Sequence, residues 1–203
     1  MVLALRSDGV TSVLDVGFRE GLALYPLYHK YGFRELVGIE ISSERQLVAQ
    51  INKDQNESFV KLFDVYSKFF RVVPELSGQQ VLPKLISEAE YRRIFDFRYS
   101  CDAGEFVGKN SNQYDLIICS NVLHSIPDLD KVKKIVSGLK EYMSKKGYIY
   151  FRIKERPGGS AIKHFHLFEE IINESFPNPS LRMYNHEVHP REGRAVTLTN
   201  LPE

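Results

Sequence analysis

A stretch of ten residues near the N-terminus constrains the fold of this chain more than any other. Residues 12–21 read Ser-Val-Leu-Asp-Val-Gly-Phe-Arg-Glu-Gly. The apolar residues up to Val16 predict a short buried strand. Gly17 and Gly21 predict a turn, and residues 22–31 predict a helix. A strand, a glycine turn and a helix form a corner at which nucleotides bind, although the same corner also occurs in α/β proteins that bind none.

A second apolar run supports a nucleotide site at this corner. Residues 36–41 predict another buried strand, and its acidic residue, Glu40, stands 23 residues after Gly17. A carboxylate at that strand end can accept hydrogen bonds from both ribose hydroxyls of a nucleoside. The alternative is a glutamate that faces solvent at the end of a strand.

The rest of the chain alternates predicted strands with predicted helices, a pattern typical of a mostly parallel α/β sheet. Two closing strands joined by a short turn imply one antiparallel member near the edge. After the first two, the expected strands are 94–99, 114–120, 148–153, 181–186 and 195–199. Asp128 is expected to cap an amphipathic helix whose last turn holds Lys145 and Lys146 and which stops at Gly147.

An aromatic stripe interrupts the alternation. Its members recur in steps of three and four, which predicts one face of a helix. They are Phe59, Leu62, Phe63, Tyr66, Phe69, Phe70 and Val73. Core packing is one interpretation, and a lid or a homodimer face are the alternatives. The length of 203 residues suits a single domain over residues 1–203, with a helical insertion at about 57–93.

Composition narrows the classes of partner. The formal net charge is +1, so no broad field favours nucleic acid or a membrane surface. The apolar start, residues 1–5, is too short for a signal peptide or a membrane span. Cys101 and Cys119 form no metal or disulfide framework by their spacing, and reduced thiols in a cytoplasmic protein are expected. No cluster of His and Cys indicates a metal site.

Several sequence motifs occur in the chain in one consistent order. Asp15, Gly17 and Gly21 match an acidic-x-Gly-x-Gly-x-Gly motif, with Arg19 where the middle glycine usually stands. The run Tyr-Asp-Leu-Ile-Ile-Cys-Ser and its continuation Asn-Val-Leu-His-Ser-Ile-Pro-Asp match a fourth-strand motif, and this match is the most specific one. In these motifs the chain resembles the class I S-adenosylmethionine-dependent methyltransferases over about residues 12–200. The resemblance implies a single-domain Rossmann-like fold with a mostly parallel seven-stranded sheet, one antiparallel strand and helices on both faces.

The resemblance also implies a cofactor, S-adenosylmethionine, with S-adenosylhomocysteine as the product. Gly17 and Gly21 would make room for its methionine half, and Asp15 would face its ammonium group. Glu40 would hold the ribose hydroxyls. The alternative for Asp15 is a residue of the helix entry.

Two further pairs of residues receive roles from the same resemblance. The Asp102 carboxylate would accept from the adenine amino group, and the Ala103 backbone N–H would meet the ring. Ser120 and Asn121 would line the methionine end, chiefly through backbone groups. The alternatives are a turn residue for Asp102 and a strand-end cap for Asn121.

Methyl transfer needs a general base only if the acceptor must first lose a proton. His124, just after the fourth strand, is the candidate, and Tyr25 and His164 are weaker ones. Packing or solvent exposure is the alternative for His124, because a single imidazole has no diagnostic spacing. The sequence lacks an Asn-Pro-Pro-Tyr run, so amide or adenine-amino acceptors are not indicated. A small-molecule acceptor is favoured because the surface lacks a basic field.

Three functions therefore stay open. The first is a small-molecule methyltransferase that uses S-adenosylmethionine. The second is a catalytically silent methyltransferase-like module for binding or assembly, which Arg19 favours because a cation near a sulfonium is repelled. The third is a nicotinamide-dependent oxidoreductase, whose Gly-x-Gly-x-x-Gly fingerprint is missing because positions 17, 19 and 22 read Gly, Arg and Leu.

Overall fold

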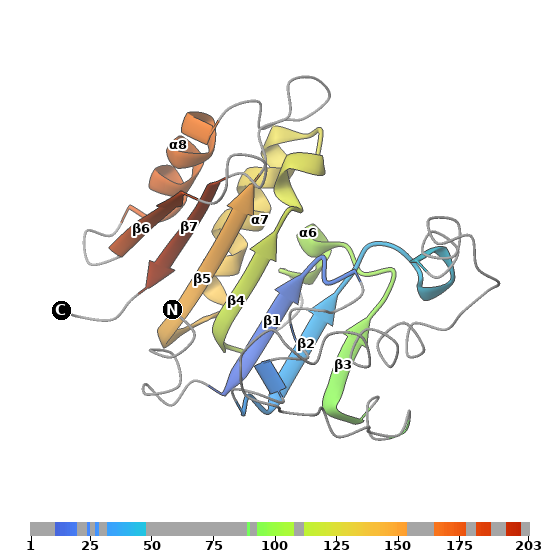
Figure 1. Ribbon diagram of the computed structural model, residues 1–203. Helices are drawn as coiled ribbons and strands as arrows, with labels where there is room; N and C mark the ends of the chain where they lie inside the picture. Colours follow the sequence, from blue (N-terminus) through green and yellow to red (C-terminus); the bar gives the residue numbers. More distant parts are fainter. Residues whose placement is uncertain are drawn as a thin grey trace.

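The described part of the chain forms one seven-stranded sheet with helices packed against it (Figure 1). The computed structural model describes residues 11–19, 24, 27–28, 32–47, 89, 93–107, 112–153, 165–177, 182–187 and 194–199. The strands are β1 (Ser12–Val16), β2 (Glu35–Ile39), β3 (Phe95–Arg98), β4 (Tyr114–Ser120), β5 (Met143–Ile153), β6 (Arg182–Glu187) and β7 (Arg194–Thr199). The helices are α6 (Ala103–Phe106), the 3₁₀ turn η1 (Leu123–Ser125), α7 (Leu129–Glu141) and α8 (Phe165–Ser175).

The strand order is β3-β2-β1-β4-β5-β7-β6. The pairs from β3 through β5 are parallel, whereas β7 runs antiparallel to both β5 and β6. The predicted fold class, with one antiparallel strand near the edge, is therefore confirmed. The order reverses between β1 and β4, the place at which open α/β sheets bind ligands beyond the carboxyl ends of their strands.

Apolar side chains cover both faces of the sheet, as alternation along the strands requires. Leu14 and Val16 of β1 point into a large core with the buried residues of α6, α7 and α8. Val13, between them in sequence, belongs to a second core with Leu24 and Leu27. The sheet is thus held between two apolar layers.

Gly32 follows the helical segment that holds Leu27 and Tyr28, directly after the predicted helix of residues 22–31. It has φ +75°, a conformation that glycine adopts without strain. Its N–H donates to the Tyr28 carbonyl, and the N–H of Phe33 donates to the Leu27 carbonyl. These bonds cover carbonyls that the helix end would leave unpaired.

The predicted end of α7 is wrong. The helix ends at Glu141, and residues 143–153 form β5, so Lys145, Lys146 and Gly147 lie in the strand. Tyr142 explains the early stop, because its hydroxyl donates to the Phe106 carbonyl at 2.9 Å while its own carbonyl accepts from Tyr114.

The pairing of β4 with the longer strand β5 contains an irregularity, which accommodates the additional residues of β5. Tyr114 pairs with Met143, but Leu116 already pairs with Tyr148. These contacts join segments far apart in sequence, so local helix signals could not reveal them.

Some predictions fall on residues outside the described ranges. Gly21, the aromatic stripe 59–73 with its proposed dimer face, and most of the insertion at about 57–93 are among them. The single domain over residues 1–203 therefore stays a prediction. No helix within the described ranges is long and apolar enough to cross a membrane.

Candidate functional site

A cavity of about 610 Å³ lies beyond the carboxyl ends of β1, β2 and β4. It is lined by residues from five separate segments of the chain, four that follow the carboxyl ends of β1, β2, β3 and β4 and one in α7. The four strand ends meet because the parallel strands end at the same edge of the sheet. The predicted site residues that line it are Gly17, Glu40, Asp102, Ala103, Ser120, Asn121 and His124. Asp15 lies in β1 and is not among the lining residues, and Gly21 lies outside the described ranges.

The glycine turn after β1 forms one wall of this cavity. Gly17 has φ +71°, and its N–H donates to the Ile39 carbonyl at 2.7 Å. A Cβ atom at this position would overlap the Cγ2 methyl of Val122. The turn therefore needs glycine for two reasons, its left-handed backbone and its close approach to the loop after β4.

Arg19, the departure from the glycine motif, keeps the backbone shape of a glycine. Its φ is +48°, a left-handed conformation that residues with a side chain rarely adopt. Its side chain is exposed, and its backbone N–H donates to Glu40 Oε2 at 3.2 Å. The turn geometry is thus preserved although the glycine is not.

Glu40 is buried, with 6% of its surface exposed, directly after β2. Its Oε2 accepts from the Arg19 N–H and its Oε1 from the Ser42 N–H at 3.0 Å. A carboxylate can accept about four hydrogen bonds, so each oxygen keeps capacity for a further donor. The side chain is held in one orientation at the rim of the cavity.

Asp15 is the most perturbed carboxyl of the site. Its residue is only 5% exposed. Burial and, second, the charge of Glu40 raise the pKa of Asp15 from 3.8 to about 8. The side chain is therefore largely protonated at neutral pH when no cation lies near it.

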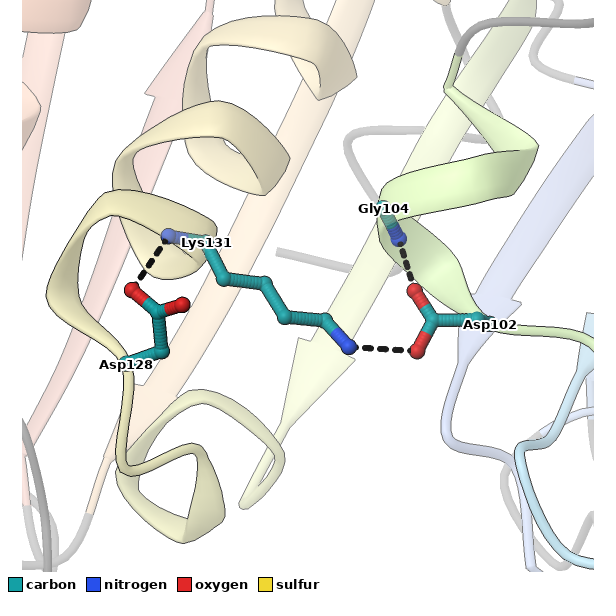
Figure 2. Close-up of polar contacts among 4 residues, drawn as sticks. All are labelled: Asp102, Gly104, Asp128 and Lys131. Atoms are coloured by element: carbon teal, nitrogen blue, oxygen red, sulfur yellow. Dashed lines mark hydrogen bonds and ion pairs between the residues drawn. The ribbon is translucent and has the colours of Figure 1, made fainter.

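Asp102 has a double role in the geometry (Figure 2). It caps α6 through Oδ1, which accepts from the Gly104 N–H at 2.8 Å, so the predicted turn role is real. Its Oδ2 accepts from Lys131 Nζ at 2.6 Å, and the residue also lines the cavity. Burial alone would raise the pKa of Asp102, but the hydrogen bonds from Lys131 and Gly104 hold it below its usual range.

The loop after β4 supplies the opposite wall. Asn121 has φ +60°, and its backbone N–H donates to the Arg152 carbonyl at 2.8 Å. Its Oδ1 is buried and, within the described part of the chain, has no hydrogen-bond partner. His124 in η1 is 3% exposed and lines the same cavity. This wall therefore offers a hydrogen-bond acceptor and an imidazole to a ligand.

Lys131 is a cavity residue that the sequence alone did not single out. It stands in the first turn of α7, three residues after the cap Asp128. The signal that could have revealed it is the sign of its charge, because the first turn of a helix favours acidic residues.

A second cavity, of about 570 Å³, lies along the amino ends of β2, β3 and β4. Its lining includes Arg34, Phe95 and Tyr114 but none of the predicted site residues. Ligands of open α/β sheets bind at the carboxyl ends, so the cavity beside Glu40 is the candidate site. Among the described residues, no group of three or more His, Cys, Asp or Glu side chains could hold a metal ion.

Comparisons with known proteins agree with this placement. A family model described as a methyltransferase domain matches residues 2–189. The chain therefore belongs to the methyltransferase domain family. The predicted membership of the class I methyltransferases is thereby confirmed. No curated protein is similar enough in sequence to count as a match.

Solved structures share the fold at low sequence identity. The N-methyltransferase NodS from Bradyrhizobium japonicum WM9 is 14% identical with a TM-score of 0.59, over 100% of this chain and 93% of that one. The plantazolicin methyltransferase BamL is 13% identical with a TM-score of 0.57, over 98% and 82% of the two chains. The [4+2]-cyclase SpnF is 11% identical with a TM-score of 0.57, over 94% and 74%. A cyclase among these neighbours shows that the fold alone does not define the reaction.

Proposed function

We propose that this protein transfers a methyl group from S-adenosylmethionine to a small-molecule acceptor. The observation that carries the proposal is the convergence of Glu40 and Asp102, each held by backbone N–H groups, on one cavity beside the Gly17 turn. Membership of the methyltransferase domain family supports it. NodS has been crystallised with S-adenosyl-L-homocysteine, which supports the choice of cofactor.

The chemistry of the cavity fits the nucleoside part of this cofactor. Glu40 has acceptor capacity for the two ribose hydroxyls. Asp102 has acceptor capacity for the adenine amino group, and the N–H of Ala103 lies beside it for the ring. A carboxylate that accepts from a neutral donor makes a stronger bond than a neutral acceptor would.

The methionine part meets a different set of groups. The sequence motif assigns Gly17 and Gly21 to the methionine part, and Gly17 lets the turn after β1 pack directly against Val122 of the loop after β4. Asn121 Oδ1 is a buried acceptor that no described residue donates to, and the ammonium group of the cofactor could donate a hydrogen bond to it. Asp15 lies deeper, and a nearby ammonium would favour its ionised form, which its burial now disfavours.

S-adenosylmethionine would supply the methyl group in activated form, on a sulfonium, so the protein needs chiefly to bind and orient the reactants. The residues of the cavity would hold the cofactor beside the acceptor and exclude water, which would lower the entropic part of the barrier. Where the acceptor must lose a proton, His124 receives it on an imidazole nitrogen. Its position in η1, on the wall of the cavity, suits that role.

A small molecule is the proposed class of acceptor. The net charge of +1 provides no field for a polyanion. Among the structural neighbours, BamL is a plantazolicin methyltransferase whose structure holds a triazolic desmethylPZN analog.

The silent module is the second candidate, and Arg19 is the observation that favours it. This residue lines the cavity, where a cation would repel the sulfonium. Its left-handed backbone argues for the enzyme, because it keeps the turn intact and its N–H still donates to Glu40. Family membership also favours the methyltransferase over the nicotinamide-dependent oxidoreductase.

Calorimetric titration of the purified chain with S-adenosylhomocysteine, with NAD as the control, tests the proposal. We expect micromolar binding of the first ligand and none of the second. Binding of neither ligand would contradict the proposal and favour the silent module. Binding of NAD alone would favour the oxidoreductase.

A further inference from the structure

Lys131 and Asp102 form an ion pair that joins the starts of two helices (Figure 2). Lys131 Nζ lies 2.6 Å from Asp102 Oδ2, and 29 residues separate the two in sequence. Asp102 caps α6, and the backbone N–H of Lys131 is itself capped by Asp128 Oδ1 at 3.1 Å in the first turn of α7. The side chain of Lys131 therefore crosses from one helix start to the other.

The first turn of α7 is an unfavourable place for this lysine. A residue three positions after an Asp cap completes a capping box when it is Glu or Gln, because its side chain accepts from the backbone N–H of the cap. A cation there also meets the positive end of the helix dipole. Residues that break a local rule of this kind are expected at functional sites.

The pair stands at the wall of the candidate cavity. Both residues line it, and both also line a separate groove of about 410 Å³. The side chains are 38% and 20% exposed for Lys131 and Asp102, so the pair is reached by solvent and by a ligand. Lys131 is thus the cation that faces the carboxylate proposed to bind adenine.

We propose that Lys131 is a positioning residue of the cofactor site, which acts by fixing the Asp102 carboxylate in the orientation that receives the adenine amino group. The inference rests on the proposed function. Gly104 donates to Oδ1 and Lys131 to Oδ2, so both carboxylate oxygens are held by a donor in one orientation. Each oxygen still has a lone pair for a ligand.

The ion pair has a second consequence, for the charge of Asp102. Burial would raise the pKa of this carboxyl, and the bonds from Lys131 and Gly104 outweigh that effect. Without Lys131, the carboxyl takes up a proton at a higher pH. The other charged or titratable groups that border Asp102 or its cavity are Glu105 of α6, Asp128, Asp130 and Lys134 of α7 and its cap, and Arg19, Glu40, Cys101 and His124.

Calorimetric titration with S-adenosylhomocysteine, from pH 5 to pH 8, tests the inference on four single variants and one double variant. We expect Lys131→Met to weaken binding about tenfold at pH 7 and Lys131→Arg to restore most of it, since a charge-assisted bond is retained. The acid limb of the affinity profile should move to higher pH in Lys131→Met. The double variant Lys131→Met with Asp102→Asn should bind no more weakly than Asp102→Asn alone, because Lys131 acts through Asp102.

The matched control is Lys133→Met. Lys133 lies in the same helix and forms an ion pair of similar length, 2.8 Å, with Glu174, but it does not line the cavity. We expect its affinity for the ligand to be unchanged. A carboxyl NMR titration of Asp102 in the ligand-free protein adds a readout without cofactor, in which Lys131→Met should raise the pKa.

The outcomes separate the two proposals. Failure of the unsubstituted protein to bind the ligand would overturn the proposed function. Binding that is equal in the unsubstituted protein and in Lys131→Met would overturn the inference alone. Losses that add in the double variant would show that Lys131 binds the cofactor directly, and would overturn the positioning role.

Discussion

Gly17 and Val122 approach each other so closely that any side chain on Gly17 would overlap the Cγ2 methyl of Val122. The contact joins the glycine turn after β1 to the loop after β4. These are two walls of the candidate cavity. Only glycine at position 17 therefore lets the turn and the loop pack directly against each other.

The first prediction compares two glycines with nearly the same backbone. Gly17→Ala should lower the free energy of unfolding by about 2–4 kcal/mol, because it adds an overlap to the cost of a left-handed alanine. Gly32 has φ +75° but open space around its missing Cβ, so Gly32→Ala should cost only about 1 kcal/mol. Urea denaturation measures both, and equal losses would contradict the contact with Val122.

The second prediction concerns the backbone of Arg19. Arg19→Gly and Arg19→Ala remove the same side-chain contacts, but only glycine adopts φ +48° without strain. The glycine variant should therefore be more stable than the alanine variant by about 1 kcal/mol in urea denaturation. An alanine variant of equal or greater stability would show that the turn is not left-handed in solution.

The third prediction concerns the buried carboxyl of Asp15. Its pKa in the folded chain is raised from 3.8 to about 8, so the folded state binds the extra proton between these values. The free energy of unfolding should therefore fall as the pH rises through this window. Asn cannot ionise, so Asp15→Asn should gain stability relative to the unsubstituted chain, on the order of a few kcal/mol by pH 9.

Denaturation of the ligand-free protein at pH 5, 7 and 9 measures this difference. The difference in the free energy of unfolding between Asp15→Asn and the unsubstituted protein should be small at pH 5 and should level off above pH 8. Profiles that run parallel for the two proteins would show that Asp15 is ionised throughout, which would contradict the effect of its burial.

The fourth prediction concerns Asp115, at the amino end of β4. Its Oδ2 accepts from the backbone N–H groups of Thr11 and Ser12, and its Oδ1 accepts from the Ser144 hydroxyl. Burial would raise the pKa of Asp115, but these hydrogen bonds hold it below its usual range. Asp115→Ala should therefore cost about 1–3 kcal/mol at pH 7, since it leaves several donors without an acceptor.

The sign of the pH effect is opposite to that of Asp15. A lowered pKa adds stability above the usual value of 3.8, and that stability is lost as the pH falls through the lower value in the folded chain. The cost of Asp115→Ala should shrink on going from pH 7 to pH 3. Asp96→Ala, which breaks a surface pair with Arg98, is the control and should change stability little at either pH.

The fifth prediction concerns the ribose-binding role of Glu40. Glu40→Gln should weaken binding of S-adenosylhomocysteine by about 1–3 kcal/mol, because it removes a charged acceptor and sets an amide N–H₂ against backbone donors. The control is Glu35→Gln, an exposed glutamate at the other end of β2. Calorimetry that finds the same loss in both variants, or in neither, would contradict the role.

Much of the fold follows from local patterns in the sequence. The bounds of β1 and β4 are as predicted, because each is an apolar run closed by polar residues or glycine. Asp128 caps α7 as predicted, since a cap depends on neighbours only two or three residues away. The end of α7 was predicted wrongly, because Tyr142 is held by Phe106 and Tyr114, which are distant in sequence.

Some features of the candidate site also follow from the sequence, whereas others depend on the tertiary structure. The sequence alone determined the residue types at the strand ends, Gly17, Glu40, Asp102 and His124, and the order of strands and helices that brings strand ends together. Only the tertiary structure decided that Lys131 reaches Asp102, that Arg19 adopts the backbone of a glycine, and that Asp15 is buried beside Glu40. The reason is that motifs record local conformation, whereas the ionisation and orientation of a side chain depend on charges and donors brought to it from other segments.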